Sequence, residues 1–438
     1  MNLRLKQNLD KLVRANLLIS TGCTEPIAIA YAVATARRTL GDEPVSITLR
    51  LSGNMAKNAM DAGVPGSNYV GAAFVAALGA LYADPDRGFE LLVGMSEEQQ
   101  ENAYQFSREH VEFEIADTDE PLYIEAILKS EASDCTNTAR VLVVESHTNV
   151  VENEFNGTSV MKNESTEDTG GAEKGKEEEV NFTMKDIYDY VDELDDFSLF
   201  KMAVSKNFEL SEEGKKNHWG LDVGKMHPFG EETTFSRVVA AATSGVDARM
   251  AGAEKPAVAC TGSGNQGITI TLPIAQLARE KRLSEAETLK AVAVGILSAI
   301  YVKRHLNVLS HLCGAVIAGS GAAAGMTYVL GGTHIQAECA ITNVLSSVVG
   351  MFCDGAKNTC ALKVAACVSM AIYAANLAMT QTGCITKRVG IVFDTIEDTI
   401  MNIAKIETNS ADVMNETILK IITTSPAHSE DIPETTQE

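Results

Sequence analysis

The sequence predicts an α+β fold, with a smaller α+β domain near the N-terminus and a mostly α-helical domain after it. Between residues 41 and 160, short apolar or alternating segments typical of strands are separated by turn-rich breaks. From 181 to about 408, the apolar spacing is helical and is interrupted by glycine-containing loops. A chain of 438 residues is long enough to hold both parts as separate domains.

The first part of the chain contains the predicted sheet. Residues 1–40 are predicted to form two helices broken at the turn TGCTEP. In 44–53, four apolar residues alternate with polar ones, as in a half-buried strand: Val45, Ile47, Leu49 and Leu51. After an alanine-rich helical pattern, further strands are predicted within 111–118, 122–130 and 139–151. The small α+β domain therefore spans 41–160.

The rest of the chain changes composition twice. Residues 161–180 are polar and charge-dense, which indicates a solvated linker or a long surface loop. Residues 181–408 form the predicted helical domain, and 409–438 are a C-terminal segment with a frayed acidic tail.

Charge and composition exclude some classes of protein. The formal net charge of −23 argues against binding of nucleic acid or an anionic membrane surface, because both require an excess of Lys and Arg. The uncharged stretch 313–332 has the length of a membrane span. However, it consists largely of alanine and glycine, which partition weakly into lipid, so a tightly packed internal helix is the better prediction.

The cysteines are expected to be reduced. The first twenty residues have helical apolar spacing and lack the apolar core and cleavage site of a secretory signal. We therefore expect a cytoplasmic protein, in which its nine cysteines serve catalysis or metal binding ahead of disulfides.

Three cysteines lie seven residues apart, at Cys353, Cys360 and Cys367. On one straight helix they would form a stripe, but the polar insert DGAKNT between the first two interrupts any helix. Cys313 lies forty residues before Cys353. Three thiolates without histidines favour iron–sulfur over zinc. The alternative is scattered core cysteines, and for Cys367, in an alanine-rich helix, packing is the preferred interpretation. Spacing alone leaves both alternatives open.

The segment AVACTGSGNQGITITL contains three glycines in G-x-G-x-x-G spacing, Gly262, Gly264 and Gly267. A dinucleotide site would need a helix directly afterwards, whereas β-branched ITITLP follows. A loop that holds a small anion, such as a carboxylate, needs only backbone amides with Ser263 and Asn265.

The turn TGCTEP places Cys23 just before a helix. Thr24 is predicted as the N-cap, with Glu25 and Pro26 in the first turn. A thiolate near a helix N-terminus is stabilised, so Cys23 is a candidate reactive thiol, with an incidental cysteine as the alternative.

Five motifs, in order along most of the chain, resemble those of one known family: TGCTEP, RLSGNMAKNAMDAGVPG, ACTGSGNQGI, LCGAVIAGSGAAAG and CDGAKNTCALK. They are similar to the L-cysteine desulfidase family, which is related to the bacterial iron–sulfur L-serine dehydratases of the alpha-chain type. The resemblance implies an enzyme that converts L-cysteine by α,β-elimination to pyruvate, ammonia and hydrogen sulfide. L-serine is the alternative substrate. A small-molecule-binding or membrane transport bundle is the alternative from another class.

The resemblance also implies roles for individual residues. Cys313, Cys353 and Cys360 would hold a [4Fe-4S] cluster whose fourth iron is open and acts as a Lewis acid, which leaves Cys339, Cys367 and Cys384 as packing residues. Cys23 would act as the base or as a transient ligand. The substrate carboxylate would be held by Ser263, Gly264, Asn265 and Gln266, with Ser52 and Asn54 as second candidates. The expected partner is a small amino acid, and the sequence does not give the oligomeric state.

Overall fold

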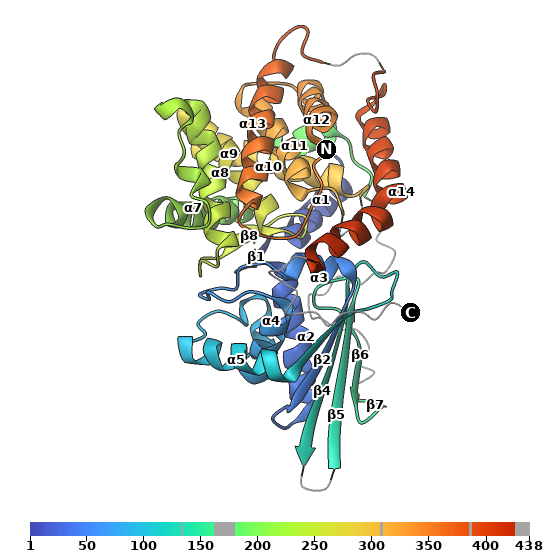
Figure 1. Cartoon of the computed structure of the whole chain (residues 1–438). Coiled ribbons are helices and arrows are strands. Elements are labelled where there is room, and N and C mark those ends of the chain that lie inside the picture. The colour runs from blue at the N-terminus through green and yellow to red at the C-terminus, as the bar shows by residue number, and fades with distance from the viewer. Residues whose placement is uncertain (133–134, 162–179, 307–309, 385–387, 425–438) are drawn as a thin grey trace. The chain divides into compact units, whose positions relative to one another are not determined.

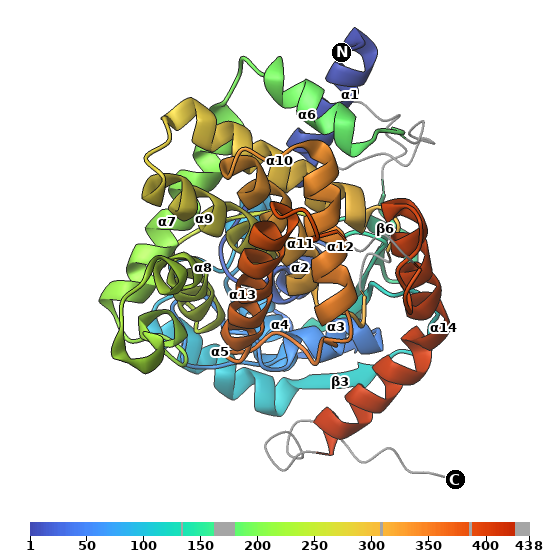
Figure 2. The same ribbon diagram turned by 90° about the horizontal axis from the view of Figure 1, so that it is seen from above.

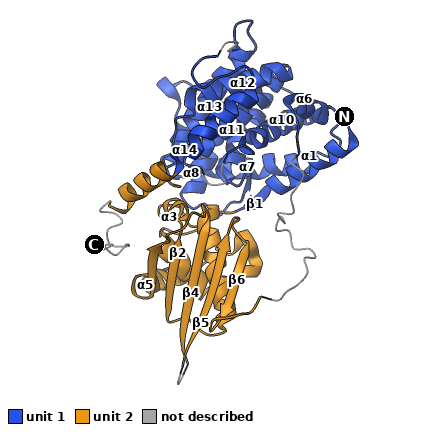
Figure 3. Ribbon diagram, turned by 90° about the vertical axis from the view of Figure 1, so that its right-hand side faces the viewer, with its two compact units in different colours: residues 1–20, 174–353, 358–411 blue, residues 21–173, 354–357, 412–438 orange. Residues whose placement is uncertain are grey.

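The chain divides into two units in the computed structural model, which describes residues 1–132, 135–161, 180–306, 310–384 and 388–424. Unit 1 comprises 1–20, 174–353 and 358–411, and unit 2 comprises 21–173, 354–357 and 412–438 (Figure 3). The predicted linker, apart from its two end residues, and the predicted acidic tail beyond residue 424 lie outside the described residues. Unit 1 is mostly helical and unit 2 combines helices with a sheet, so the predicted α+β class is confirmed.

Unit 2 is built on a six-stranded sheet in the order β3-β2-β4-β5-β6-β7 (Figure 1). The strands β2 and β3 are parallel, and the other neighbours are antiparallel. The strands are β2 (Ser46–Leu51), β3 (Val111–Ile115), β4 (Tyr123–Ala132), β5 (Cys135–Val144), β6 (Val150–Phe155) and β7 (Thr158–Ser159). The helices are α2 (Thr24–Leu40), α3 (Gly53–Ala59), α4 (Ala72–Leu81), η1 (Pro85–Glu90) and α5 (Glu97–His110).

The two faces of this sheet differ as the alternation in β2 predicts. Ile47, Leu49 and Leu51 are buried on the face that α2 and α4 cover. On the other face Arg50 pairs with Glu114 and with Glu125 of the neighbouring strands. One detail of the prediction is wrong: Val45 lies before the first residue of β2 and is exposed.

Unit 1 packs its helices around α11. The N-terminal elements are α1 (Leu3–Asn16) and β1 (Leu18–Ser20), followed by α6 (Met184–Asp192), α7 (Ser198–Lys216), η2 (Val223–Lys225), η3 (Pro228–Gly230), α8 (Thr234–Met250), β8 (Ala257–Ala259) and α9 (Gly264–Glu280). The chain then forms α10 (Glu285–Lys303), α11 (Gly314–Val329), α12 (His334–Val348), α13 (Cys360–Ala378) and α14 (Ile396–Thr423). The part of α14 after residue 411 belongs to unit 2. Figure 2 shows α11 surrounded by α9, α10, α12 and α13, all of which contact it.

The uncharged stretch 313–332 forms this central helix, as predicted. Nearly all residues of α11 are buried, and their small side chains allow close approach of the neighbouring helices. Among the described residues one helix, α13, is long and apolar enough to cross a membrane. That is weak evidence for a span, because a core helix of the same length and composition meets the same criterion.

Candidate functional site

Two short extended segments lie side by side ahead of α11 and α13. The backbone N–H of Cys313 donates to the carbonyl oxygen of Met351 at 2.8 Å, and that of Cys353 donates to the carbonyl oxygen of His311 at 2.7 Å. Leu312 and Phe352 form the antiparallel bridge between these bonds. The pairing brings together two cysteines that are forty residues apart in the sequence.

Two of the three predicted ligands lie at helix N-termini. Cys313 is the N-cap residue of α11, and Cys360 is the first residue of α13. The aligned peptide dipoles and unpaired N–H groups at such a terminus favour a negatively charged sulfur. Cys313 is buried, whereas Cys353 and Cys360 are half-buried, and none of the three is in a disulfide. The polar insert between Cys353 and Cys360 precedes the helix, as predicted.

Cys353 and Cys360 lie close enough to Cys313 to affect its ionisation. Burial, together with these two neighbours, raises the pKa of Cys313 to about 12, although a backbone N–H of Ala315 and the amine of Lys363 lower it. A buried thiolate next to two others is costly without a compensating positive charge. A bound metal group supplies that charge, so this donor set fits one.

Among the residues that the structure describes, no three His, Cys, Asp or Glu side chains are grouped closely enough to hold one metal ion. In a four-iron cluster each thiolate binds a different iron, so its ligands are spaced more widely than those of one zinc ion. Three soft thiolates without a histidine fit the cluster by their chemistry as well.

Two lysines that follow Cys353 in the sequence have local partners. Lys357, in the insert, pairs with the Asp354 carboxylate and donates to the Asp354 carbonyl oxygen at 3.1 Å. Lys363 donates from Nζ to the carbonyl oxygen of Phe352 at 3.0 Å, at the paired segments themselves. Lys363 is therefore the cation that lies beside the thiols of unit 1.

The glycine motif of 262–267 forms a tight turn that leads directly into a helix. Cys260 and Ser263 exchange two backbone hydrogen bonds of 3.1 Å, and the two residues between them have φ of 51° for Thr261 and 84° for Gly262. Positive φ at both positions is the conformation of a type I′ turn. The helix α9 begins at Gly264 and includes the ITIT segment, so the expectation that no helix follows is wrong. In the described chain β8 pairs antiparallel with β1 and has no parallel neighbour, so the parallel βαβ unit of a dinucleotide site is absent there.

The N-terminus of α9 presents polar groups beside a buried guanidinium. Ser263 occupies the N-cap position, and its side chain makes no capping bond. Arg249, of which 3% is exposed, donates from Nη1 to Oδ1 of Asn265 at 3.0 Å. A Cβ atom at Gly264 would lie 2.4 Å from Nε of Arg249, so this position accepts only glycine at the present spacing. The arrangement can bind an anion through backbone amides and side-chain donors.

The glycine motif and the cysteine segments meet at Gln266. A Cβ atom at Gly314, the residue after Cys313, would lie 2.9 Å from Nε2 of Gln266. Oε1 of the same side chain accepts a hydrogen bond of 2.7 Å from Thr261. The structure therefore brings Gln266, from the predicted carboxylate loop, next to the first predicted cluster ligand.

The remaining predicted residues belong to unit 2. Cys23 is buried and is itself the N-cap residue of α2, so the prediction of Thr24 as the cap is wrong by one residue. Ser52 caps α3, accepting from the N–H of Met55 and donating to the carbonyl oxygen of Pro121 at 2.8 Å. Asn54 lies in the first turn of the same helix.

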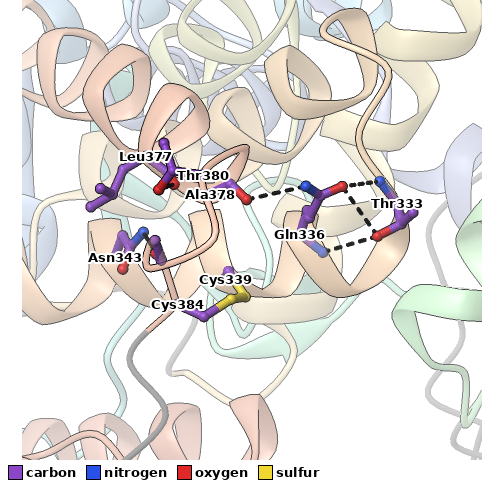
Figure 4. The surroundings of a disulfide bond; sticks show 9 residues. Thr333, Gln336, Cys339, Asn343, Leu377, Ala378, Thr380 and Cys384 are labelled. Carbon is purple, nitrogen blue, oxygen red and sulfur yellow. Dashed lines mark hydrogen bonds between the residues drawn. A yellow bond between two sulfur atoms is a disulfide. The ribbon is translucent and has the colours of Figure 1, made fainter.

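Cys339 and Cys384, predicted as reduced packing residues, are joined in a disulfide (Figure 4). Cys339 lies on α12, Cys384 follows α13, and their Cα atoms are 5.1 Å apart. Asn343 holds the same loop by donating to the carbonyl oxygen of Gly383 at 2.9 Å. The expectation is wrong because the pairing depends on the packing of α12 on α13, which the spacing of 45 residues does not reveal.

From the sequence we did not identify two residues that lie near the site, Arg249 and His311. Arg249 lies within a helical pattern with no local feature that distinguishes it from a surface residue. His311 lies two residues before Cys313, so the motif SHLCG did contain a signal. Its side chain is 3% exposed, and its Nε2 lies 3.2 Å from Oγ of Ser410 on α14.

Comparison with known proteins identifies the family. A family model described as serine dehydratase alpha chain matches residues 86–420. The chain is 37% identical over 423 residues to a UPF0597 protein of Clostridium perfringens (strain SM101 / Type A), covering 94% of this chain and 97% of that protein. It is 34% identical over 428 residues to a UPF0597 protein of Bacteroides fragilis, covering 95% and 98%. A UPF0597 protein of Oleidesulfovibrio alaskensis is 36% identical over 422 residues, covering 94% and 96%. These matches extend over most of the chain, and the chain therefore belongs to the serine dehydratase alpha chain family, a family of lyase-type enzymes.

Proposed function

We propose that the protein is an iron–sulfur lyase that converts L-cysteine to pyruvate, ammonia and hydrogen sulfide by α,β-elimination. The observation that carries this proposal is the grouping of three disulfide-free thiols, Cys313, Cys353 and Cys360, around the paired segments before α11 and α13. The family is generally iron–sulfur dependent, which supports a [4Fe-4S] cluster on these thiols.

The chain's own residues bind the substrate and move its proton. When bound, the cluster would supply a Lewis acid that makes the leaving group easier to expel. Backbone amides at the N-terminus of α9, with Ser263, Asn265 and Gln266, would hold the carboxylate. Cys23, at the N-terminus of α2, would accept the α-proton as its general base. Loss of sulfide then leaves aminoacrylate, which water hydrolyses to pyruvate and ammonia.

L-serine is the second candidate substrate, and the description of the family model favours it. The elimination is the same except that hydroxide rather than hydrosulfide leaves, and hydroxide is the poorer leaving group. The carboxylate and ammonium groups of the two substrates are identical, so the residues proposed above would bind either one.

Anaerobic reconstitution tests the proposal. Iron and acid-labile sulfide per chain would be measured first, followed by pyruvate and sulfide release with L-cysteine and pyruvate release with L-serine. We expect iron binding and sulfide release from L-cysteine. Turnover of L-serine with little sulfide from L-cysteine would assign the dehydratase reaction instead. A protein that binds no iron and turns over neither substrate would leave a small-molecule-binding or transport role.

A further inference from the structure

Unit 2 contains a buried group of hydrogen-bond acceptors close to the turn TGCTEP. Glu25 lies in the first turn of α2, and its carboxylate accepts 3.0 Å hydrogen bonds from Oγ1 of Thr24 and from Nδ2 of Asn58. Within the described residues, both hydrogen bonds to this carboxylate come from uncharged groups, and no lysine or arginine is paired with it.

The orientation of Asn58 follows from its partner. A carboxylate only accepts hydrogen bonds, so the atom of Asn58 that faces Glu25 is its NH₂ group. The other atom, Oδ1, is buried and has no hydrogen-bond partner among the residues that the structure describes. Asn54 lies one turn earlier on the same face of α3, and its Oδ1 is likewise buried without a partner.

His147, in the connection between β5 and β6, completes the group. Its ring nitrogen Nε2 is buried without a partner in the described part of the chain, although the residue as a whole is only half-buried. Burial lowers the pKa of His147, and the nearby Glu25 raises it, so the imidazole lies near this carboxylate and burial favours its neutral form. Among the described residues, three buried atoms near Glu25 therefore lack a protein partner, which is uncommon in a folded protein and leaves them open to a bound molecule.

We propose that Glu25, Asn54, Asn58 and His147 bind the α-ammonium group of an amino acid. A primary ammonium carries a positive charge and three N–H donors. The positive charge would pair with the carboxylate of Glu25. Two of the N–H groups would donate to Oδ1 of Asn58 and Oδ1 of Asn54, and the third to a lone pair of Glu25 or of His147. This inference rests on the proposed function in one respect: it assumes that the ligand is an amino acid.

The test compares ligands that differ in the ammonium group alone. L-Alanine has an ammonium and a carboxylate but no leaving group, and propionate lacks the ammonium. Binding of both to the full-length, anaerobically prepared protein would be measured by calorimetry. We expect wild type to prefer L-alanine to propionate, and Glu25→Gln to reduce this preference by about tenfold or more, as for one lost charge-assisted hydrogen bond. Asn58→Ala should reduce it in the same direction.

Glu97→Gln is the matched control. Glu97 also lies in the first turn of a helix of unit 2, α5, but it is exposed, so its replacement should leave the preference intact. Thermal melting would show whether each variant is folded. If Glu25→Gln does not fold, Asn58→Ala decides the result.

Three outcomes would overturn the inference. They are an unchanged preference in folded Glu25→Gln and Asn58→Ala, no preference in wild type, and binding of ammonium chloride as tight as that of L-alanine. A protein without lyase activity that still shows the Glu25-dependent preference would contradict the proposed function and leave this site standing.

Discussion

The backbone N–H of Cys353 donates a 2.7 Å hydrogen bond to the carbonyl oxygen of His311. The imidazole of His311 is buried, and its Nε2 contacts Oγ of Ser410 at 3.2 Å. That hydroxyl already donates to the carbonyl oxygen of Ile406 at 2.7 Å, which makes Nε2 of His311 the donor in this contact. The segments that carry Cys313 and Cys353 are therefore held by backbone bonds and by α14, and not by the thiols themselves.

The first prediction follows because the segments that carry these cysteines do not depend on the thiols for their structure. Replacing Cys313, Cys353 or Cys360 by alanine leaves the backbone pairing intact, so each variant should fold but lose iron and turnover. Iron per chain after anaerobic reconstitution and pyruvate release would be measured for each. The physical reason is that a cluster with an open iron has only three protein ligands, and two do not retain it.

Cys367→Ala is the control for these variants. Cys367 is completely buried on α13, among alanines. Burial raises the pKa of its thiol, and the nearby Cys313 raises it further. We predict that this variant keeps its iron and its activity, because packing is the role we assign to Cys367. Iron loss in Cys367→Ala combined with full iron in Cys360→Ala would contradict the choice of ligands.

The second prediction concerns the disulfide between Cys339 and Cys384. A bond that closes 45 residues restricts the unfolded chain, so Cys339→Ser should lower the free energy of unfolding by about 2–4 kcal/mol without reductant. In the presence of dithiothreitol the variant and wild type should be equally stable. Urea unfolding under both conditions measures this difference. Alkylation of both cysteines in native, unreduced protein would show that the bond does not form.

The third prediction is a pH dependence of stability from Asp247. Its buried carboxylate accepts backbone N–H groups of Gly224 at 3.0 Å and Leu221 at 3.4 Å. Burial raises its pKa from 3.8 to about 6, although these bonds lower it. The folded state then holds more protons than the unfolded state between about pH 4 and pH 6, so this group's contribution to stability falls as the pH rises through that range.

Asp247→Asn removes the titration and nearly conserves the shape of the side chain. Urea unfolding at several pH values between 4 and 7 should therefore give a flatter profile for the variant than for wild type. A profile with the same slope in both proteins would show that Asp247 is already ionised in the folded state at pH 4.

The sequence predicted local features better than pairings. The alternation through Ile47, Leu49 and Leu51 identified β2, and the polar insert after Cys353 was correctly predicted to lie outside a helix, because both depend on near neighbours in the chain. The β-branched ITIT segment misled the prediction, since packing of α9 inside unit 1 outweighs its weak helix propensity. The disulfide of Cys339 and the contact of Arg249 with Asn265 depend on helix packing, which one sequence does not show.

The last prediction concerns Cys23. It is a buried N-cap residue whose side chain makes no capping bond, so the helix does not require the thiol, and Cys23→Ala should fold. If Cys23 is the general base, the variant should keep nearly full iron but lose turnover by on the order of 10²- to 10⁴-fold. Cys23→Ser retains the size of the side chain but not the acidity of a thiol, so it should be impaired to a similar extent.

The pattern of iron and turnover separates the roles of this thiol. A permanent fourth ligand would lose iron in Cys23→Ala to the same degree as in Cys353→Ala, because both changes remove a sulfur from the cluster. An incidental cysteine would keep both iron and turnover. Full iron with little turnover is expected only if the thiol acts on the substrate. The pH profile adds an independent readout. If Cys23 is the base, turnover of wild type should fall at low pH as the thiolate is protonated, and the residual turnover of Cys23→Ala should lack this fall.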